Sequence, residues 1–366
     1  MRIAIFETEH FEAAYPLIRL FDNGENELTI FAYPAAKQQL EYMLKDDTGK
    51  YHWIVKEEGQ SRISFINTIQ KEVKKRKIEL LYLNTVTDNF IFYAKMVASI
   101  DARVILTVHT INSFFETKEK YRPRKLATAV GKSLLCFFIR EYNVLSQAMV
   151  PVLRHRLGRN KKVHNIPGGV FEGVAIQPRY SLQNPVHFVI PGSIDSKRRD
   201  YEKAFELLSL LQKESIAVKL TFLGRFCGEY GQIILAKSKT CDNLSYYNEN
   251  EVDQPEFDRV LQSADFIFTP SVVHTIIDNG VKETYGVTIS SGNIADVIRH
   301  ARPFIIPQSL TVDPQLDNSS VRYANVEDIV SFIKSAIEDP EIYERLSQAA
   351  LKASEEYTVE KLRERL

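Results

Sequence analysis

The segment 282–292 holds the groups best suited to chemistry on an anionic, hydroxyl-rich ligand. It contains one carboxylate, Glu283, two glycines, Gly286 and Gly292, and two neighbouring hydroxyls, Ser290 and Ser291, and a helical run follows it. A glycine-containing loop that opens a helix directs backbone N–H groups and the positive end of the helix dipole toward one point. Glu283 would stand beside that point, either to bind the ligand or to compensate the dipole.

Five more candidate side chains follow apolar runs that are typical of strands. In chain order they are Glu9, His10, His109, Lys197 and Arg198. Ligands of open α/β sheets bind beyond the carboxyl ends of the strands, where these residues are expected to lie. Each also has a structural interpretation, because a lone histidine is often a buried structural residue and a run of cations is often a solvated surface.

Short apolar runs alternate with helical periodicity along the chain, which is typical of parallel sheets covered by helices on both faces. The first half is expected to contain strands at 2–6, 27–33, 53–56, 78–83, 104–108 and 144–150, and helices at 11–21, 62–75 and 89–99. The segment 165–185 is rich in proline and glycine, which is typical of a linker. The second half is expected to contain strands at 187–190, 218–223, 266–269 and 304–306, and helices at 201–212, 257–262, 293–301, 326–337 and 341–356.

This pattern predicts an α/β protein with two doubly wound, Rossmann-like β/α domains that face each other across a cleft. We expect the first domain at residues 1–175 and the second at 176–345. Residues 346–366 are expected to form a C-terminal helix, with packing against the first domain as one option.

Composition is that of an ordinary globular protein, but the charge is unevenly divided. The first 180 residues carry 27 basic and 19 acidic side chains, whereas the rest carry 20 basic and 28 acidic ones. Residues 118–139 are basic and amphipathic, so a peripheral contact with an anionic membrane surface is one expectation for them, and a buried helix is the other. Three widely spaced cysteines and the lack of a signal pattern favour a cytoplasmic location.

The order of several motifs resembles retaining GT-B glycosyltransferases, in particular the family 4-like group with a Glu-x7-Glu signature. The motifs are Gly192–Asp200, Leu223-Gly224-Arg225, Ala264–Ser271, Glu283-x-x-Gly286 and Arg302–Pro307 in the second half, with Thr107-Val108-His109 and Asn165–Val170 in the first. The resemblance spans nearly the whole chain. It rests on order and spacing, since no single motif is specific.

The resemblance implies a role for each candidate residue. Glu283 would contact donor-sugar hydroxyls and His109 would face the same sugar. The diphosphate would be bound by Lys197, Arg198, Gly286, Val287 and Thr288, the nucleotide ribose by Ser290 or Ser291, and the acceptor side would include Glu9 and His10. No metal and no further cofactor are expected, because in this fold cations of the protein neutralise the leaving diphosphate.

Three departures from the family pattern accompany this resemblance. Ser291 occupies the position of the second signature glutamate, and Ser193 occupies that of the usual arginine. The first loop, around Glu7 to His10, lacks the glycines that relatives bring close to the phosphates. Ser290 and Ser291 could equally serve only as caps of the following helix.

The resemblance implies a metal-independent, hexosyltransferase-like enzyme that transfers a sugar from a nucleotide sugar, with retention, to an unidentified glycan, lipid-linked or protein acceptor in polysaccharide or glycoconjugate assembly. A non-catalytic binding subunit and a nucleotide-sugar epimerase of the same fold are the alternatives. P-loop, dinucleotide-binding, zinc-protease and serine-hydrolase motifs are absent from the sequence. Nucleic acid is not an expected partner, because the basic clusters lack interleaved aromatic residues.

Overall fold

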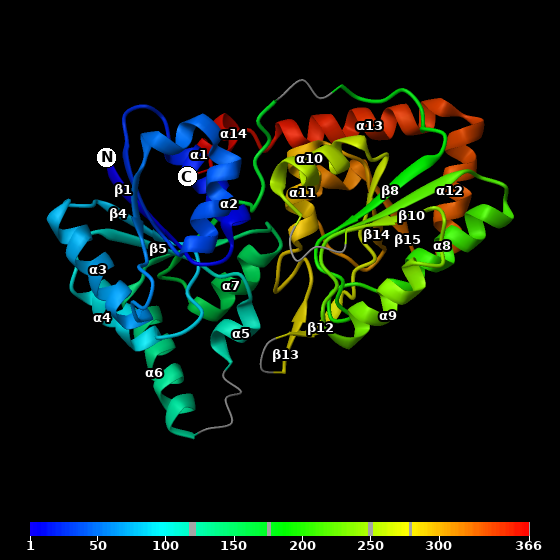
Figure 1. The fold of residues 1–366 in the computed structure, drawn as a ribbon. Coiled ribbons are helices and arrows are strands. Elements are labelled where there is room, and N and C mark those ends of the chain that lie inside the picture. The colour runs from blue at the N-terminus through cyan, green and yellow to red at the C-terminus, as the bar shows by residue number, and fades with distance from the viewer. Residues whose placement is uncertain (117–121, 174–176, 248–251, 278–279, 366) are drawn as a thin grey trace.

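The computed structural model describes residues 1–116, 122–173, 177–247, 252–277 and 280–365. Two α/β halves lie side by side, each built on its own parallel sheet (Figure 1). Both ends of the chain lie on the N-terminal half (Figure 1).

The first sheet has seven parallel strands in the order β3-β2-β1-β4-β5-β6-β7. Their bounds are β1 (Arg2–Glu7), β2 (Glu27–Ala32), β3 (His52–Val55), β4 (Leu80–Leu83), β5 (Arg103–Thr107), β6 (Glu141–Val144) and β7 (Lys162–Asn165). Strands of a sheet covered on both faces are almost wholly apolar, as in β1, where Ile3, Ala4, Ile5 and Phe6 are at most 1% exposed. The strand order reverses between β1 and β4, so their carboxyl ends form a switch point where ligands of such sheets bind.

Helices cover both faces of this sheet. They are α1 (Phe11–Phe21), α2 (Pro34–Leu44), α3 (Arg62–Lys75), α4 (Phe90–Ala98), α5 (Ile111–Phe115), α6 (Arg122–Phe138) and α7 (Met149–Leu157), with a 3-10 turn η1 (Lys45–Lys50). Ser61 begins α3 by accepting a hydrogen bond from the Ser64 N–H. No helix in the described part of the chain is long and apolar enough to cross a membrane.

The second sheet has six parallel strands in the order β10-β9-β8-β11-β14-β15. Their bounds are β8 (Val186–Pro191), β9 (Val218–Leu223), β10 (Leu244–Tyr246), β11 (Phe266–Phe268), β14 (Phe304–Pro307) and β15 (Ser320–Tyr323). An antiparallel hairpin of β12 (His274–Ile277) and β13 (Val281–Thr284) projects from the end of β11. The order reverses between β8 and β11, which creates a second switch point facing the first half.

The helices of the second half are α8 (Glu202–Lys213), α9 (Gly228–Ser238), α10 (Gln254–Ser263), α11 (Gly292–His300), α12 (Val326–Glu338), α13 (Pro340–Glu355) and α14 (Val359–Arg363), with a 3-10 turn η2 (Pro314–Ser319). A reciprocal capping box between Asn325 and Asp328 begins α12. The last helix, α14, returns to the first half, where Arg363 donates hydrogen bonds to the carbonyls of Leu20 and Asp22, both at 2.8 Å.

The prediction of two doubly wound β/α domains is confirmed. Two local predictions are wrong. The strand expected at 144–150 ends at Val144, because Met149 and Leu153 follow helical spacing and are fully buried in α7. The loop expected from residue 282 begins later, since residues 281–284 form β13. The predicted boundary between residues 175 and 176 lies outside the described residues.

One hydrophobic cluster joins the two halves. It includes Ala14 and Ile18 of α1, Val297 and Ile298 of α11, and Tyr357 between the last two helices, all at most 1% exposed. The apolar faces of α1 and α11 therefore share a core, and the carboxyl ends of the two sheets are held toward each other.

Candidate functional site

A buried carboxylate organises the loop that follows β1. Glu7 is 0% exposed, and its Oε1 accepts hydrogen bonds from the N–H groups of Thr8, Glu9 and His10 at 2.6–2.7 Å. Its Oε2 accepts from the side chains of Asn84 and Thr85. Three successive N–H groups make an anion-binding concavity, and here the anion is the protein's own carboxylate. Burial raises the pKa of Glu7 above its ordinary value.

Two histidines from different loops, His10 after β1 and His109 after β5, stack on each other. The ring of His10 lies 4.4 Å from that of His109, with an angle of 22° between the planes. Burial lowers the pKa of His109 to about 3, with the His10 charge acting in the same direction, so His109 is neutral. Its Nε2 donates to the Asn84 carbonyl at 2.7 Å, which leaves Nδ1 as an acceptor.

His10 carries the charge of this pair. Burial acts to lower its pKa, but the 3.0 Å hydrogen bond between Nδ1 and Glu12 and the charges of Glu12, Glu7 and Glu9 outweigh it and raise the pKa to about 9. The predicted residues His10 and His109 are therefore brought together, one charged and one neutral. Glu9, the other residue predicted on this side, is exposed.

In the turn between β13 and α11, three backbone N–H groups donate hydrogen bonds to carbonyls of the same turn. The N–H of Gly286 donates to Ile289 O at 2.7 Å, and those of Val287 and Thr288 donate to Thr284 O at 3.1 and 2.9 Å. Gly286 has φ +81°, and an added Cβ would lie 2.0 Å from the Thr311 carbonyl oxygen. The glycine is therefore required by close backbone packing, and the three amides predicted to bind a diphosphate already have partners within the turn.

The start of α11 leaves its polar groups open. Ser291 is the N-cap residue, but its side chain makes no capping hydrogen bond, and no acidic residue lies in the first turn. Gly292 is exposed and has open space around its Cα, whereas Asn293 is 1% exposed. The N–H of Ile294 donates to Ser291 O at 3.1 Å, and the remaining first N–H groups of a helix have no intrahelical partner, so this end presents donors and a positive dipole end. Ser290 lies beside it, half-buried.

A buried arginine contacts this open helix start. Arg199 is 8% exposed, donates to the Ser193 carbonyl at 3.0 Å and to Asn293 Oδ1, and its Nε has no hydrogen-bond partner among the described residues. No carboxylate of the described chain lies within ion-pair distance of it. A buried charge without a direct ion-pair partner is costly, so this position favours an anionic ligand, although the charge of Arg199 also acts on Asp296. Gly192 makes room for the guanidinium, since a Cβ there would lie 2.9 Å from Nη2.

The cations predicted for this role point elsewhere. Lys197 and Arg198 are exposed, and Arg198 lies 3.7 Å from Asp195 in a surface ion pair. Residues 196–198 form a turn in which the N–H groups of Arg198 and Arg199 donate to Asp195 O, and an isolated antiparallel bridge joins Arg199 to Ser271. Arg199 is buried where this turn ends, whereas Lys197 and Arg198 lie on its exposed side.

Glu283 is used in a contact between the two halves. It is 2% exposed, and its Oε1 and Oε2 accept hydrogen bonds from the N–H groups of Ser113 and Asn112, at 2.7 and 3.4 Å. The Asn112 side chain also donates to Lys282 O at 2.9 Å. The predicted sugar-binding carboxylate thus caps the start of α5 in the opposite half.

A second carboxyl group in the cleft has a shifted pKa. Asp296 is half-buried one turn into α11. Burial is the main cause that raises its pKa to about 7. The positive charges of Arg299 and Arg199 act to lower the pKa, and the negative charges of Asp258 and Glu12 act to raise it. This side chain can therefore change charge near neutral pH.

The cleft residues come from four loops and one helix start. Sequence reasoning identified His10, His109 and the helix start, but it missed Arg199, Asn293 and Asp296. Arg199 belongs to the run Lys197-Arg198-Arg199, but no local sequence signal shows which of these three cations is buried. Among the described residues, no group of three or more His, Cys, Asp or Glu side chains is placed to hold a metal ion.

The comparisons agree on the fold. No protein-family model matches the chain, and no curated protein is similar to it in sequence. A sucrose-phosphate synthase from Thermosynechococcus elongatus has a TM-score of 0.65 at 12% identity, covering 99% of this chain and 96% of its own. The Anabaena protein HepE, solved with UDP and glucose, also has a TM-score of 0.65, at 11% identity, with 100% and 97% covered.

An epimerase has the same architecture. The UDP-GlcNAc 2-epimerase from Neisseria meningitidis, bound to UDP-GlcNAc, has a TM-score of 0.58 at 10% identity, with 97% of this chain and 98% of the other covered. Glycosyltransferases and epimerases thus share this arrangement of domains over their full lengths. The predicted GT-B fold is confirmed, and the chain has the fold of GT-B glycosyltransferases and epimerases.

Proposed function

We propose that this protein is a glycosyltransferase that takes its sugar from a nucleotide diphosphate donor. Arg199 at the open start of α11 is the observation that carries the proposal. A buried guanidinium whose Nε has no hydrogen-bond partner among the described residues and a helix start without an acidic residue in its first turn together favour a diphosphate. Solved proteins of the same fold bind UDP or UDP-sugars, which supports UDP as the first nucleotide to test.

In this proposal the chemistry is electrostatic and positional. The bond from the sugar to the diphosphate breaks as negative charge grows on the leaving group, and Arg199 with the first amides of α11 stabilises that charge. Ser290 and Ser291 lie at the same helix start as the proposed diphosphate site, and we assign the ribose to them. Lys197 and Arg198 contribute only a general positive potential, because both are solvent-exposed.

The sugar and acceptor sides of the proposal use the other half. The neutral His109 orients the donor sugar, and Glu283 supports the sugar side by fixing the loop of Asn112 and Ser113, to which both of its oxygens are bonded. Glu9 and the charged His10 face the acceptor. Transfer with retention, a metal-independent hexosyltransferase activity and a place in polysaccharide or glycoconjugate assembly complete the proposal. No cofactor other than the donor is proposed.

The test is calorimetric titration with UDP. Arg199→Met should weaken UDP binding on the order of 50-fold or more, as expected for loss of a buried charged contact. Arg198→Met tests the sequence-based assignment directly and should change binding by less than about threefold, as for an exposed charge. Lys219→Met, on an exposed position of β9, is the control.

A second variant keeps the test independent of folding. Asn293→Asp places a carboxylate against Arg199 in the first turn of α11, so it should stabilise the helix while it excludes the diphosphate. A folded Asn293→Asp protein that binds UDP as well as the parent, or a parent that binds no nucleoside diphosphate, would contradict the proposal.

The epimerase is retained as a second candidate because titratable groups gather in the cleft. His10, Glu12 and Asp296 could move a proton, which an epimerisation through a broken C–H bond requires. Incubation of nucleotide sugars in D2O distinguishes the candidates: deuterium in the recovered donor favours epimerisation, and free sugar or glycoside without deuterium favours transfer. A non-catalytic subunit would give neither product.

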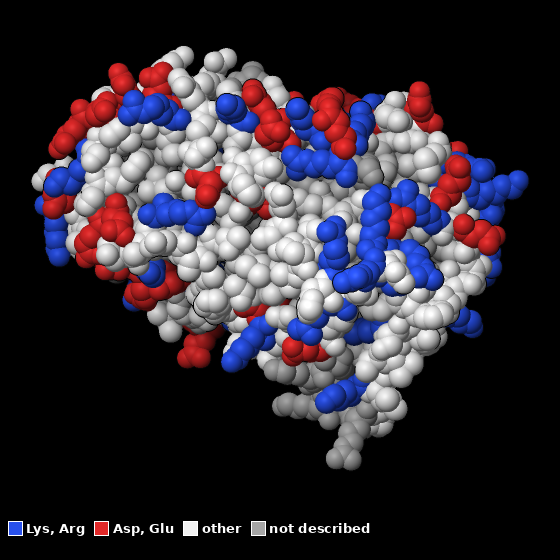
Figure 2. Space-filling model, turned by 180° about the vertical axis from the view of Figure 1, so that it is seen from behind, with Lys and Arg blue, Asp and Glu red and all other residues white. Residues whose placement is uncertain are grey.

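We further propose a cytoplasmic protein with a peripheral membrane contact through residues 118–139, of which 118–121 lie outside the described residues. In the rear view of Figure 2, basic side chains gather on the N-terminal half, and an almost uncharged strip runs along α6 below them. Exposed basic residues of this half include Arg140, Arg154, Arg159 and Lys162. Flotation with anionic vesicles at low salt tests this contact, and complete absence of binding would remove it.

A further inference from the structure

A cavity of about 570 Å³, hereafter the β14–β15 cavity, lies in the C-terminal half at the carboxyl ends of β11, β14 and β15. Its polar side chains come from five segments of the chain. They are Lys203 of α8, Ser271 after β11, His274 of β12, Gln308 and Ser309 after β14, and Tyr323 at the end of β15. The cavity is therefore a product of the tertiary fold.

Lys203 supplies the positive charge of the β14–β15 cavity. It is half-buried in the first turn of α8, and its Nζ lies 5.3 Å from the centre of the Tyr323 ring. Its neighbour Glu202 pairs with Lys237 instead, and within the described part of the chain no carboxylate lies within ion-pair distance of Lys203. A half-buried ammonium over an aromatic face, without a direct ion-pair partner, favours an anionic ligand.

Two carboxylates near the cavity serve the starts of the flanking helices. Asp200 accepts a hydrogen bond from the Glu202 N–H at 3.2 Å, at the start of α8. Asp328 accepts from the N–H groups of Ala324 and Asn325 at the start of α12. Neither carboxylate lines the cavity, and none of the described residues that line it is acidic. The polar lining is therefore cationic or neutral.

The neutral side chains of the lining can both donate and accept hydrogen bonds. Tyr323 is 1% exposed, and its hydroxyl has no hydrogen-bond partner among the described residues. Burial and the charge of Asp200 raise the pKa of Tyr323, so it remains a phenol. The side chains of Ser271, Gln308 and Ser309 make no hydrogen bond within the described chain. Such groups match the hydroxyls of a sugar, which also donate and accept, better than they match a simple anion, which only accepts.

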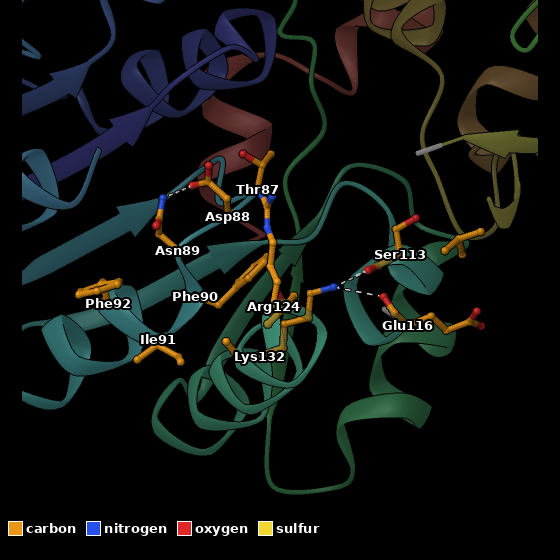
Figure 3. Close-up of a pocket in the computed structure, with 13 residues that line it drawn as sticks. Thr87, Asp88, Asn89, Phe90, Ile91, Phe92, Ser113, Glu116, Arg124 and Lys132 are labelled. Carbon is orange, nitrogen blue, oxygen red and sulfur yellow. Dashed lines mark hydrogen bonds between the residues drawn. The ribbon is translucent and has the colours of Figure 1, made fainter. Parts of the chain in front are cut away.

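The pocket between α4, α5 and α6 has a different character (Figure 3). The carboxylates Asp88 and Glu116 line it together with the cations Arg124 and Lys132. The ammonium of Lys132 donates to the carbonyls of Ser113 and Glu116 at 2.7 and 3.2 Å. Charges of both signs are present there, so that pocket does not select an anion as the β14–β15 cavity does.

We propose that the β14–β15 cavity binds a sugar that carries one anionic group, with the anion at Lys203 and the sugar hydroxyls at Gln308 and Ser309. The site is separate from the proposed diphosphate site, because none of its described lining residues belongs to α11. The two sites are neighbours, since Ser271 lines the cavity and also pairs with Arg199. The inference concerns a second ligand and does not depend on the transferase proposal.

The experiment is an NMR titration, observed on the ligands, with glucuronate, glucose 1-phosphate, glucose and inorganic phosphate. At least one of the two charged sugars should bind about fivefold more tightly than both glucose and inorganic phosphate, because only a charged sugar uses the ammonium and the neutral groups together. Lys203→Met should weaken this binding about fivefold and leave glucose unchanged. Gln308→Ala, at an exposed position, should weaken it about threefold and leave inorganic phosphate unchanged. Lys213→Met, at an exposed position in the last turn of α8, is the control.

Three results would overturn the inference. They are charged sugars that bind no more tightly than inorganic phosphate, equal losses in Lys203→Met and Lys213→Met, or displacement of the charged sugar by UDP. UDP titration of the same preparations separates the two proposals. A protein that binds a charged sugar but no UDP keeps this site and contradicts the nucleotide proposal, whereas one that binds UDP but no charged sugar loses only this site.

Discussion

The starts of α1 and α11 face the cleft from opposite halves, and they differ in whether the positive end of the helix is neutralised by the protein. At α1, the loop N–H groups converge on the Glu7 carboxylate, so the positive end is already neutralised from within. At α11, Ser291 makes no cap and a buried cation, Arg199, adds to the positive potential. The comparison suggests where to look for a ligand: an anion-binding geometry is available to one only where the protein supplies no anion of its own.

The comparison also reverses one expectation from the resemblance. The loop after β1 lacks the glycines with which relatives approach phosphate, and Glu7 accounts for their absence, since no phosphate needs to come near. In the proposed function the diphosphate would then depend on the C-terminal half alone, and the N-terminal half would bind the sugar and the acceptor.

The largest expected effect comes from removing the Glu7 carboxylate, which neutralises the start of α1. Glu7→Gln would place an amide among five donors, and loss of a buried, fully bonded carboxylate should lower the free energy of unfolding by about 3 kcal/mol. Urea unfolding at pH 7 measures the change. Glu9→Gln, in the same loop but exposed, should change stability by less than about 0.5 kcal/mol. Equal effects of the two variants would mean that Glu7 does not hold the loop.

The open start can be made to resemble the neutralised one. Gly292→Asp adds an acidic group to the first turn of α11 without a steric conflict, and it should weaken UDP binding about tenfold while raising stability by about 0.5–1 kcal/mol. Gly292→Ala should give a similar gain in stability, because glycine is removed from a helix, but little change in affinity. Unchanged affinity in Gly292→Asp would place the diphosphate elsewhere.

The smallest expected effect is a pH dependence that belongs only to the open start. The pKa of Asp296 is about 7, so this carboxyl gains negative charge as pH rises from 6 to 8 and should weaken binding of a UDP-sugar about threefold to tenfold. The pKa values of His10 and His109, about 9 and about 3, lie outside this window. Asn in place of Asp296 should give affinity independent of pH, and a slope retained in Asp296→Asn would assign the titration to another group.

The raised pKa of Asp296 also makes the stability of the folded protein depend on pH. Its folded pKa is raised above the ordinary value of 3.8, so its contribution is fully present at low pH and is lost as pH rises through about 7. The parent protein should therefore gain stability relative to Asp296→Asn as the buffer is acidified from pH 8 to pH 5.

The sequence predicted the fold better than the site because the two depend on interactions of different range. Strands such as β1 and β8 are apolar runs whose identity is local. The hairpin of β12 and β13 was missed, because its position depends on α5 in the other half, where Glu283 bonds to Ser113. Arg199 was missed for the same reason: its direction is set by pairing with Ser271, which is 72 positions away along the chain.

The hydrophobic cluster shared by α1, α11 and the residues around Tyr357 determines how the molecule comes apart. Two sheets suggest two independent melting units, but a core continuous between them couples their unfolding into one cooperative transition. The last helix belongs to this unit, since its residue Leu362 is 1% exposed and lies in the same cluster. The N-terminal half is therefore completed by α14, so its full stability depends on a segment that follows the second sheet along the chain.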